Sequence, residues 1–582
     1  MTETLRGMAV AAGVVLGQAH VIRRDRIRVR EDFIPKAQLG REIDRYKDAL
    51  RRTRGELKEI RRRIRADNSA GIADFLDAHL LMLKDSALAS APADIIKERQ
   101  CNAEWALHLQ RERLLTAFEG IADPYLRARK DDVEHVVERV LRNLLGLGAA
   151  PDAVTLPAGA ASVVVVEDIS PTDLLALHQQ GVIAVICESG GLNSHSAILA
   201  RGLGISAVFG VHEAGQRIHH GDDLIVDGGA GIIYVAPDQS LSSYYQQRRQ
   251  QQQRELAALR QLRDLPARTV DGQLIMLRAN VELAEDVEMI AGVNADGIGL
   301  YRTEMMFLGR REPPGEQEQF ALYRRVVEEM AGRPVTFRTL DVGADKPLGG
   351  AQTPRAGAAA INPALGLRAV RWYLQEPEIF QCQVRAILRA SALGPVRLLL
   401  PMLTTLGEVI QIRALIRAQQ DMLQRAGIDF DARLAIGGMI EVPAAALLAD
   451  VFARHLDFLS IGTNDLIQYT LAADRLDEEV NYLCDPLQPA ILRLIALTIQ
   501  AGAEAGVPVA LCGEMAGDPR YTRLLLGMGL REFSMTPAML PRIKQIILTT
   551  RLADTERRVQ ELWQKVDSDE IAVGVDNLNV GI

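Results

Sequence analysis

The chain has 582 residues, which is too long for a single hydrophobic core, so we expect about three or four domains. Charged residues make up 24% of the chain, aromatic residues 4%, and the net charge of −8 argues against nucleic acid as the main partner. No apolar run approaches the roughly 18 residues of a membrane span, there is no secretory signal, and the five cysteines lack disulfide or zinc spacing. These features predict a cytoplasmic protein with reduced thiols and no membrane insertion.

The first part of the chain changes from strand-like to helical sequence. Residues 7–22 predict one or two strands with a glycine-marked turn. From Pro35 to Ile64 apolar residues recur at helical spacing between charged ones, which predicts a long amphipathic helix. Three more helical patterns follow, at 73–84, 102–118 and 133–145. The stretch therefore predicts an all-helical bundle, whose histidines we interpret as surface or packing residues.

Continuous β-branched runs mark the next region as a small α/β unit. They predict buried strands, separated by a short helix at Pro171–Gln179, over the ranges 162–166, 182–187, 205–208 and 224–226. The strands at 7–22 are expected to join this sheet, so that the helical bundle is an insertion.

One turn of this α/β unit carries a candidate reactive group. The run Gly190–Arg201, GGLNSHSAILAR, predicts a turn followed by a helix, with His195 at or just before the first helical turn. Free backbone N–H groups and the helix dipole favour an anion at such a place, so an imidazole there could carry a phosphoryl group. The alternative is a capped turn whose histidine only forms a hydrogen bond.

Residues 240–264 are strongly polar, rich in Gln and Arg, and free of Gly and Pro. They predict one exposed helix. The pattern fits a spacer between two domains and an edge helix of one domain equally well.

From residue 270 onward strand and helix patterns alternate, which predicts a (β/α)8 barrel. The eight candidate strands are 274–281, 297–301, 335–338, 396–402, 434–440, 458–461, 507–511 and 532–535.

Charged residues follow these strands at their carboxyl ends, where barrels have their active sites. Arg302 and Arg338 follow strands two and three, and Arg475 comes ten residues after Asp465. Arginines bind phosphate and carboxylate through paired N–H bonds. The pattern indicates a small, multiply anionic substrate, with a structural network of ion pairs as the alternative.

Two carboxylates and a thiol complete this set. Glu441 and Asp465 follow neighbouring strands and could share a hard divalent cation such as Mg2+. Cys512 follows strand seven and could be a nucleophile, a buried packing residue or a general acid, since a thiol is mostly protonated at neutral pH.

Several long motifs along nearly the whole chain resemble enzyme I of the phosphoenolpyruvate-dependent phosphotransferase system, the phosphoenolpyruvate–protein phosphotransferase family. Besides GGLNSHSAILAR they are GIGLYRTEMMF (297–307), FRTLDVGADK (337–346), INPALGLRAVR (361–371), GGMIEVPAA (437–445), SIGTNDLIQYTLAADR (460–475) and LCGEMAGD (511–518). The resemblance implies that phosphoenolpyruvate phosphorylates a histidine of the enzyme and leaves as pyruvate, and that the phosphoryl group then passes to a small carrier.

The resemblance also implies residue roles. His195 is the expected phosphoryl acceptor and Cys512 the expected proton donor to the enolpyruvate carbon. Glu441 and Asp465 are the expected Mg2+ ligands. The expected ligands of the phosphoenolpyruvate phosphate and carboxylate are Arg302, Arg338, Asn464 and Arg475.

The family's organisation implies five expectations about domains and partners. The phosphohistidine α/β domain is expected over 1–29 and 149–236, and the inserted helical domain that docks an HPr-type carrier over 30–148. A linker helix is expected over 237–266, and the phosphoenolpyruvate-binding barrel, which also forms a homodimer, over 267–582.

Some positions depart from the family pattern. Leu192 and Asn193 replace the usual Arg and Thr before the histidine, Gln488 stands where a histidine is usual, and Ala344 where a glycine is usual. The sequence leaves open whether the pathway is sugar uptake or its nitrogen-regulatory branch. Alternatives are a nucleotide-dependent relative such as pyruvate phosphate dikinase, and a regulatory protein that binds phosphoenolpyruvate without turnover.

Overall fold

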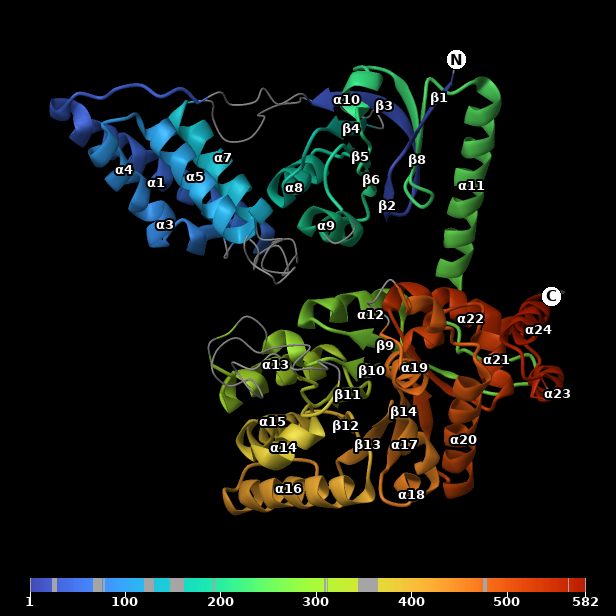
Figure 1. The fold of residues 1–582 in the computed structure, drawn as a ribbon. Helices are drawn as coiled ribbons and strands as arrows, with labels where there is room; N and C mark the ends of the chain where they lie inside the picture. The colour runs from blue at the N-terminus through green and yellow to red at the C-terminus, as the bar shows by residue number, and fades with distance from the viewer. Residues whose placement is uncertain are drawn as a thin grey trace. The chain divides into compact units, whose positions relative to one another are not determined.

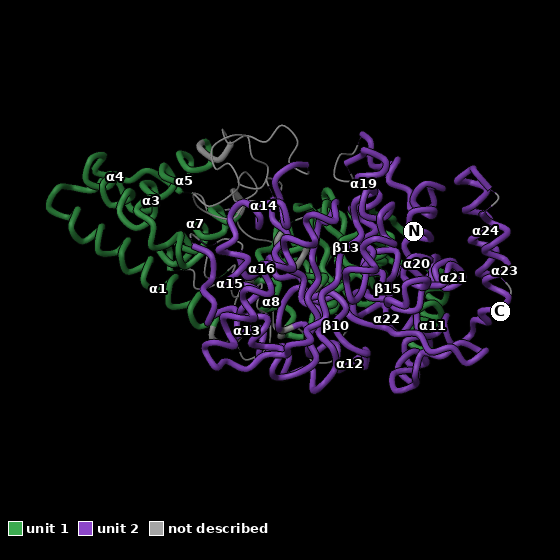
Figure 2. Tube along the Cα trace, turned by 90° about the horizontal axis from the view of Figure 1, so that it is seen from below, with its two compact units in different colours: residues 1–254 green, residues 255–582 purple. Residues whose placement is uncertain are grey.

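The computed structural model describes residues 2–22, 29–65, 76, 79–119, 130–146, 162–191, 194–307, 310, 312–343, 365–474, 479–563 and 565–580. The chain divides into two compact units, Met1–Arg254 and Glu255–Ile582, each of which is described by itself (Figure 2).

The first unit contains the helical bundle that the sequence predicts (Figure 1). Its helices are α1 (Leu39–Arg65), α3 (Ser86–Ala89), α4 (Ala91–Arg99), α5 (Ala103–Glu119) and α7 (Lys130–Leu144). Helix α1 is amphipathic as predicted, because Tyr46, Leu50 and Leu57 lie on one buried face. The helices expected over 102–118 and 133–145 are confirmed, and the one expected over 73–84 lies partly outside the described residues.

An eight-stranded mixed sheet forms the rest of this unit, in the order β1-β8-β7-β3-β4-β5-β6-β2. The strands are β1 (Glu3–Arg6), β2 (Met8–Ala11), β3 (Val14–Ile22), β4 (Ser162–Val166), β5 (Ala184–Cys187), β6 (Ser206–Phe209), β7 (Asp223–Asp227) and β8 (Ile232–Val235). Strands β3 to β6 are parallel, and β3 pairs with β4 although the whole bundle lies between them in the chain. The prediction that the N-terminal strands join the sheet is confirmed.

Three helices connect these strands: α8 (Pro171–Gln179), α9 (His195–Leu203) and α10 (Ala214–Arg217). Ser170 caps α8, because its Oγ accepts a hydrogen bond from the backbone N–H of Asp173 at 3.2 Å. Apolar residues of α8 and α9 share one core with the bundle, so the bundle and the sheet pack on each other.

A long polar helix, α11 (Gln239–Gln261), follows the sheet close to the range predicted. Tyr245 on its first half is buried against Val14 and Ile225 of the sheet. Asp227 Oδ2 accepts a hydrogen bond from Arg248 at 2.7 Å. The first half of α11 is therefore an edge helix of the sheet, whereas residues 249–258 are exposed.

The second unit is a closed barrel of eight parallel strands. They are β9 (Met276–Val281), β10 (Ile298–Tyr301), β11 (Val335–Arg338), β12 (Val396–Leu400), β13 (Ala435–Ile440), β14 (Phe458–Ile461), β15 (Val509–Leu511) and β16 (Glu532–Met535). All eight predicted strands are confirmed, and the barrel fold with them.

Helices alternate with the strands around the barrel (Figure 1). They are α12 (Val287–Val293), α13 (Glu316–Glu329), α14 (Val370–Gln375), α15 (Pro377–Ser391), α16 (Leu406–Arg425), α17 (Pro443–Leu447), α18 (Ala449–Ala453), α19 (Thr463–Leu471), α20 (Pro489–Ala505), α21 (Thr522–Gly527), α22 (Leu540–Thr549), α23 (Leu552–Leu562) and α24 (Ser568–Asn579). Among the described helices, none is both long and apolar enough to span a membrane.

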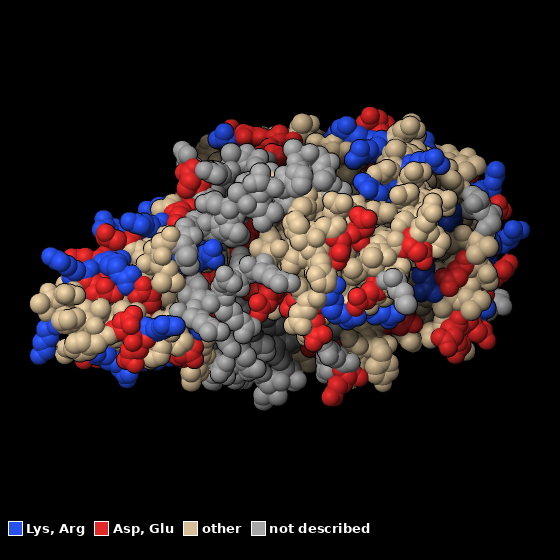
Figure 3. Space-filling view, turned by 90° about the horizontal axis from the view of Figure 1, so that it is seen from above, with Lys and Arg blue, Asp and Glu red and all other residues tan. Residues whose placement is uncertain are grey.

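Basic and acidic side chains are interspersed among the described residues of the face in Figure 3.

Candidate active site

A buried arginine lies at the carboxyl end of the third barrel strand. Arg338 is the last residue of β11 and only 5% exposed. Its Nη2 donates a hydrogen bond to Glu304 Oε1 at 2.8 Å, and its Nη1 lies 3.5 Å from Asp341 Oδ2. Burial alone would lower the pKa of Arg338, but the charges of Glu304 and Asp341 outweigh it and raise the pKa above its ordinary value. The guanidinium is therefore held charged at the barrel mouth.

A second buried arginine shares the same aspartate. Arg368 Nη2 donates to Asp341 Oδ1 at 2.9 Å, and its Nη1 donates to Tyr469 Oη at 3.2 Å. Arg368 belongs to the motif at residues 361–371, but the sequence predicted no role for it. The only sequence signal for Arg368 is its place in the Gly-Leu-Arg run of that motif. Its position beside Asp341 becomes visible only in the folded barrel.

The two predicted metal ligands include a fully buried carboxyl group. Glu441 follows β13, and its Oε1 accepts a hydrogen bond from the backbone N–H of Met402 at 2.6 Å. Its Oε2 is buried without a hydrogen-bond partner among the described residues. Burial, with the charges of Asp465 and Asp341, raises the pKa of Glu441 to about 8.

This pair of carboxylates fits a hard cation that keeps other ligands of its own. In the described part of the chain no group of three or more side chains has the arrangement of a metal site. Mg2+ commonly uses only one or two protein carboxylates, with water and substrate phosphate oxygens as its other ligands. The buried, unpartnered Oε2 of Glu441 is an oxygen that such a cation would satisfy.

A protonated thiol lies at the end of the seventh strand. Cys512 is 2% exposed; its Sγ accepts a hydrogen bond from Ser460 Oγ at 3.2 Å and lies 3.6 Å from the carbonyl oxygen of Ile461. Burial raises the pKa of the Cys512 thiol, so the thiol stays protonated at neutral pH. Of the three readings left open, the thiolate nucleophile is the one that this environment disfavours.

The predicted residues of the mouth act on one another. The charges of Arg338, Glu441 and Arg302 all contribute to the pKa of the Cys512 thiol. Those of Glu441 and Asp465 contribute to the pKa of Arg338. Arg302 is more exposed and forms an ion pair with Glu282. The fold thus brings two of the three predicted arginines together with the carboxylates and the thiol.

Backbone contacts fix the position of the thiol. Asn280 Nδ2 donates to the carbonyl oxygen of Cys512 at 2.9 Å, and Ser534 Oγ donates to Asn280 Oδ1 at 2.6 Å. A side chain at Gly513 would lie 1.9 Å from Thr463 Oγ1, so only glycine allows this close approach.

Among the remaining positions that the sequence singles out, the structure describes Asn464 and Gln488 but not Arg475 or Ala344. Asn464 exchanges two hydrogen bonds with Glu514, one from its Nδ2 to Oε1 at 2.8 Å and one to its Oδ1 from the backbone N–H at 3.0 Å. Arg475 and Ala344 lie outside the described residues. Gln488 precedes α20 as its N-cap residue without a side-chain cap hydrogen bond.

His195 lies in the first unit, and the predicted helix start is confirmed there. It is the first residue of α9, and the Oγ of the preceding Ser194 accepts a hydrogen bond from the backbone N–H of Ala197 at 3.2 Å. The His195 side chain, Leu192 and Asn193 lie outside the described residues.

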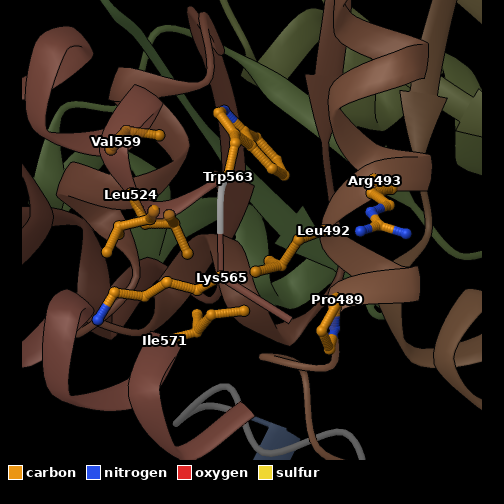
Figure 4. Close-up of a pocket in the computed structure, with 9 residues that line it drawn as sticks. Pro489, Leu492, Arg493, Leu524, Val559, Trp563, Lys565 and Ile571 are labelled. Carbon is orange, nitrogen blue, oxygen red and sulfur yellow. The ribbon is translucent and has the colours of Figure 1, made fainter. Parts of the chain in front are cut away.

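A pocket elsewhere in the barrel unit contains none of the predicted residues (Figure 4). It lies among the C-terminal helices and is mostly apolar, lined by Pro489, Leu492, Arg493, Leu524, Val559, Leu562, Trp563, Lys565 and Ile571. Its charged lining residues are Arg493 and Lys565, and Lys565 lies 3.8 Å from Glu570.

Comparisons with known proteins match the chain throughout. The model of the PEP-utilising enzyme PEP-binding domain matches residues 256–552, that of the N-terminal domain residues 6–129, and that of the mobile domain residues 159–231. A phosphoenolpyruvate-protein phosphotransferase of Cupriavidus necator is 46% identical over 99% of this chain and 100% of its own length. One of Bacillus subtilis is 37% identical over 94% of both chains.

The chain belongs to the phosphoenolpyruvate-protein phosphotransferase family, whose members are transferases. A magnetic resonance structure of an Enzyme I protein, 27% identical, covers 43% of this chain and 99% of its own with a TM-score of 0.38. The resemblance drawn from the sequence motifs is confirmed at the level of the family. The roles of individual residues stay predictions.

Proposed function

We propose that this enzyme transfers the phosphoryl group of phosphoenolpyruvate to His195, releases pyruvate, and then passes the group to a histidine of an HPr-type carrier. The observation that carries the proposal is the barrel mouth, where a buried charged arginine, the fully buried carboxyl group of Glu441 with the charge of Asp465, and a protonated thiol act on one another. Phosphoenolpyruvate is a trianion, so it needs cations to bind it, and its methylene carbon must accept a proton, so it needs an acid nearby.

Arginines bind the substrate in this proposal. Arg302, Arg338 and Arg475 pair with the phosphate and carboxylate oxygens, Asn464 adds a hydrogen bond, and buried Arg368 adds a further cation. Phosphoryl transfer depends mostly on positioning and on stabilising charge, which fixed guanidinium groups provide without reorganisation.

Glu441 and Asp465 would hold Mg2+, and the unpartnered buried oxygen of Glu441 supports this assignment. The ion, when bound, neutralises negative charge on the phosphate. Without it, the two carboxylates repel, which contributes to the raised pKa of Glu441.

The chemical step moves one phosphoryl group and one proton. A neutral imidazole nitrogen of His195 bonds to phosphorus as the bond from phosphorus to the enol oxygen breaks, which leaves the enolate of pyruvate. The Cys512 thiol then gives its proton to the methylene carbon, pyruvate forms, and the thiolate takes a proton from solvent. The raised pKa of Cys512 keeps the thiol in the acid form that this step needs.

The domains take separate tasks in this proposal. The α/β domain over 1–29 and 149–236 carries His195, and the inserted helical domain over 30–148 docks the carrier. A linker over 237–266 joins them to the barrel over 267–582, which binds phosphoenolpyruvate and forms a homodimer. Helices α1 and α4 of the bundle each keep one face exposed, and these faces offer a surface for a carrier.

The test is incubation of the purified chain with [32P]phosphoenolpyruvate and Mg2+, followed by addition of a purified HPr-type carrier. We expect acid-labile label on the protein, one pyruvate per label, and transfer to the carrier without any nucleotide. Label that remains on a His195→Ala variant would disprove the acceptor, and a requirement for ATP would favour the dikinase alternative. Comparing a sugar-uptake carrier with a nitrogen-branch carrier assigns the pathway.

A further inference from the structure

A pair of ionic contacts joins the helical bundle to the loop that follows β4. His135 on α7 has its Nε2 3.2 Å from Asp168 Oδ2. One helical turn further along α7, Arg139 Nη2 lies 3.9 Å from Asp173 Oδ1 on α8. His135, Arg139 and Asp173 are largely buried, whereas the Asp168 side chain is about half exposed. We call His135, Arg139, Asp168 and Asp173 the latch.

The loop held by the latch also contacts the helix that begins at His195. Ser196, the residue after His195, is buried, and its Oγ donates a hydrogen bond to the carbonyl oxygen of Ile169 at 2.6 Å. Ser170 Oγ donates to Asp173 Oδ2 at 2.7 Å and caps α8. A continuous chain of contacts therefore runs from α7 of the bundle, through residues 168–173, to the start of α9.

The packing around the latch places both parts in one core. Val136 and Val140 of α7 belong to the same apolar cluster as Ile169 and Leu174. The ionic contacts are thus not an isolated surface pair but the polar rim of a packed contact. Because His135, Arg139 and Asp173 are largely buried, removing the partner of any one of them leaves a poorly solvated polar or charged group behind.

His135 is the member of the latch that can change its charge near neutral pH. Groups that face it are Asp132 on α7, Asp168 on the loop, Asp173 on α8, and on the bundle side His79 and Arg139. Burial alone would lower the pKa of His135, but the hydrogen bond and charge of Asp168, with Asp173 and Asp132, outweigh it and raise the pKa. Burial lowers the pKa of neighbouring His79, which therefore stays neutral.

We propose that the latch is a positioning device that fixes the start of α9 relative to the bundle, and that its closed form requires protonated His135. This inference rests on the proposed function. Loading of His195 at the barrel does not need the bundle, whereas unloading onto a carrier docked on the bundle needs His195 at a fixed place relative to it. The latch therefore acts on the second half-reaction.

The direction of the pH effect follows from the sign of the charge. Protonated His135 attracts Asp168, so the latch is closed at low pH and opens as the pH rises through the raised pKa of this imidazole. Transfer from phosphorylated His195 to the carrier is expected to slow over that range.

The experiment compares the full-length chain with His135→Gln, Asp168→Asn and the double variant, and with His178→Gln as a matched control on the exposed end of α8. Single-turnover rates are measured for both half-reactions between about pH 6 and pH 9, a range that extends above the ordinary titration of histidine because the pKa of His135 is raised. The carrier is a purified HPr-type protein. The His135 imidazole is titrated by magnetic resonance with histidine-selective labelling.

We expect His135→Gln and Asp168→Asn each to slow carrier transfer about threefold to tenfold at the acidic end and to flatten its pH profile, with no further loss in the double variant. Loading from phosphoenolpyruvate and the His178→Gln control stay within about twofold of wild type. In Asp168→Asn the His135 titration moves to lower pH.

Unchanged carrier transfer in both single variants, or an equal loss in loading, would overturn the latch. Wild-type protein that phosphoenolpyruvate does not load would instead overturn the proposed function, and that failure shows in the first half-reaction before any variant is compared.

Discussion

The barrel mouth and the start of α9 differ in the kind of contact that holds their side chains. At the mouth, Arg338, Glu441 and Cys512 are almost completely buried and their charges act on one another. At the start of α9, the described contacts are hydrogen bonds of two neutral serines, Ser194 and Ser196. The described contacts of the two regions therefore differ, because charged groups act on one another at the barrel mouth, whereas Ser194 and Ser196 hold the first turn of α9 through neutral hydrogen bonds.

The largest combined effect, on activity and on stability together, is expected for Arg338→Met. It should lower kcat/KM for loading from phosphoenolpyruvate by at least about 100-fold to 1000-fold, since one fixed donor at developing charge contributes that much. It should also destabilise the barrel by about 3–5 kcal/mol, because Glu304 and Asp341 lose a buried partner. Rapid-quench loading assays and chemical unfolding measure the two effects.

Two controls sharpen the comparison. Arg302→Met removes a half-exposed arginine and should lower loading with a stability change of less than about 1 kcal/mol. Reverse loading of His195 from a phosphorylated carrier should survive in both variants. If Arg338→Met abolished reverse loading as well, the two sites would not be separable as we argue.

The sequence predicted the frame of both regions because each rests on a strong local pattern. Buried parallel strands form continuous apolar runs, so all eight barrel strands were found, and the residues at their carboxyl ends followed from the barrel itself. Strands β1 and β8 and helices α3 and α4 were not predicted, since they are short and have no clear period.

Other features depend on contacts that no local pattern encodes. The pair of Arg368 with Asp341 joins residues 27 positions apart, and the hydrogen bond of Asn280 to Cys512 joins residues 232 positions apart. The latch contact between His135 and Asp168 likewise joins residues 33 positions apart, and the sequence predicted only a surface or packing role for His135. Burial of Glu441 also comes from the fold alone.

The second effect in size is expected for Cys512→Ala. Loss of the general acid should slow pyruvate formation from phosphoenolpyruvate by about 100-fold to 10,000-fold. Reverse loading of His195 from a phosphorylated carrier should persist, because it needs no proton on carbon. Cys512→Ser is the matched variant, since it keeps a hydrogen-bonding group but is a far weaker acid. Equal loss in both directions for Cys512→Ala would contradict the proton-donor role.

The wild-type pH profile tests the same assignment. The raised pKa of Cys512 keeps the thiol protonated as the pH rises past the ordinary value for a thiol, so proton donation should not fall off there. Pyruvate release from single-turnover loading, measured against pH, should show no loss from this group at mildly alkaline pH.

Glu441→Gln is expected to change the pH dependence of stability. Because the folded pKa of Glu441 is about 8 and its ordinary value 4.5, the stability from the neutral form is complete below 4.5 and is lost as the pH rises to about 8. The metal-free barrel should therefore melt at lower temperature at pH 8 than at pH 5, and Glu441→Gln should flatten that slope.

Calorimetry with Mg2+ completes this test. Mg2+ should raise the melting temperature of the wild type and release protons below pH 8, because its ligand must be the ionised carboxylate. It should do neither in Glu441→Gln, whereas Glu329→Gln on the surface of α13 should behave as wild type. A wild-type melting temperature that did not depend on pH would contradict the burial of a protonated Glu441.

The smallest effect is expected at the other region, for Ser194→Ala. The variant removes the N-cap hydrogen bond to Ala197, which should lower the free energy of unfolding of the first unit by about 0.5–2 kcal/mol. Ser194→Asn supplies another good N-cap residue and should restore most of that loss. Binding of phosphoenolpyruvate to the barrel, measured by calorimetry, should be the same in all three proteins, because the substrate's charges are balanced within the second unit. A weaker substrate affinity in Ser194→Ala would show that the start of α9 contributes to binding phosphoenolpyruvate, and the distinction between the charged barrel mouth and the first turn of α9 would no longer hold.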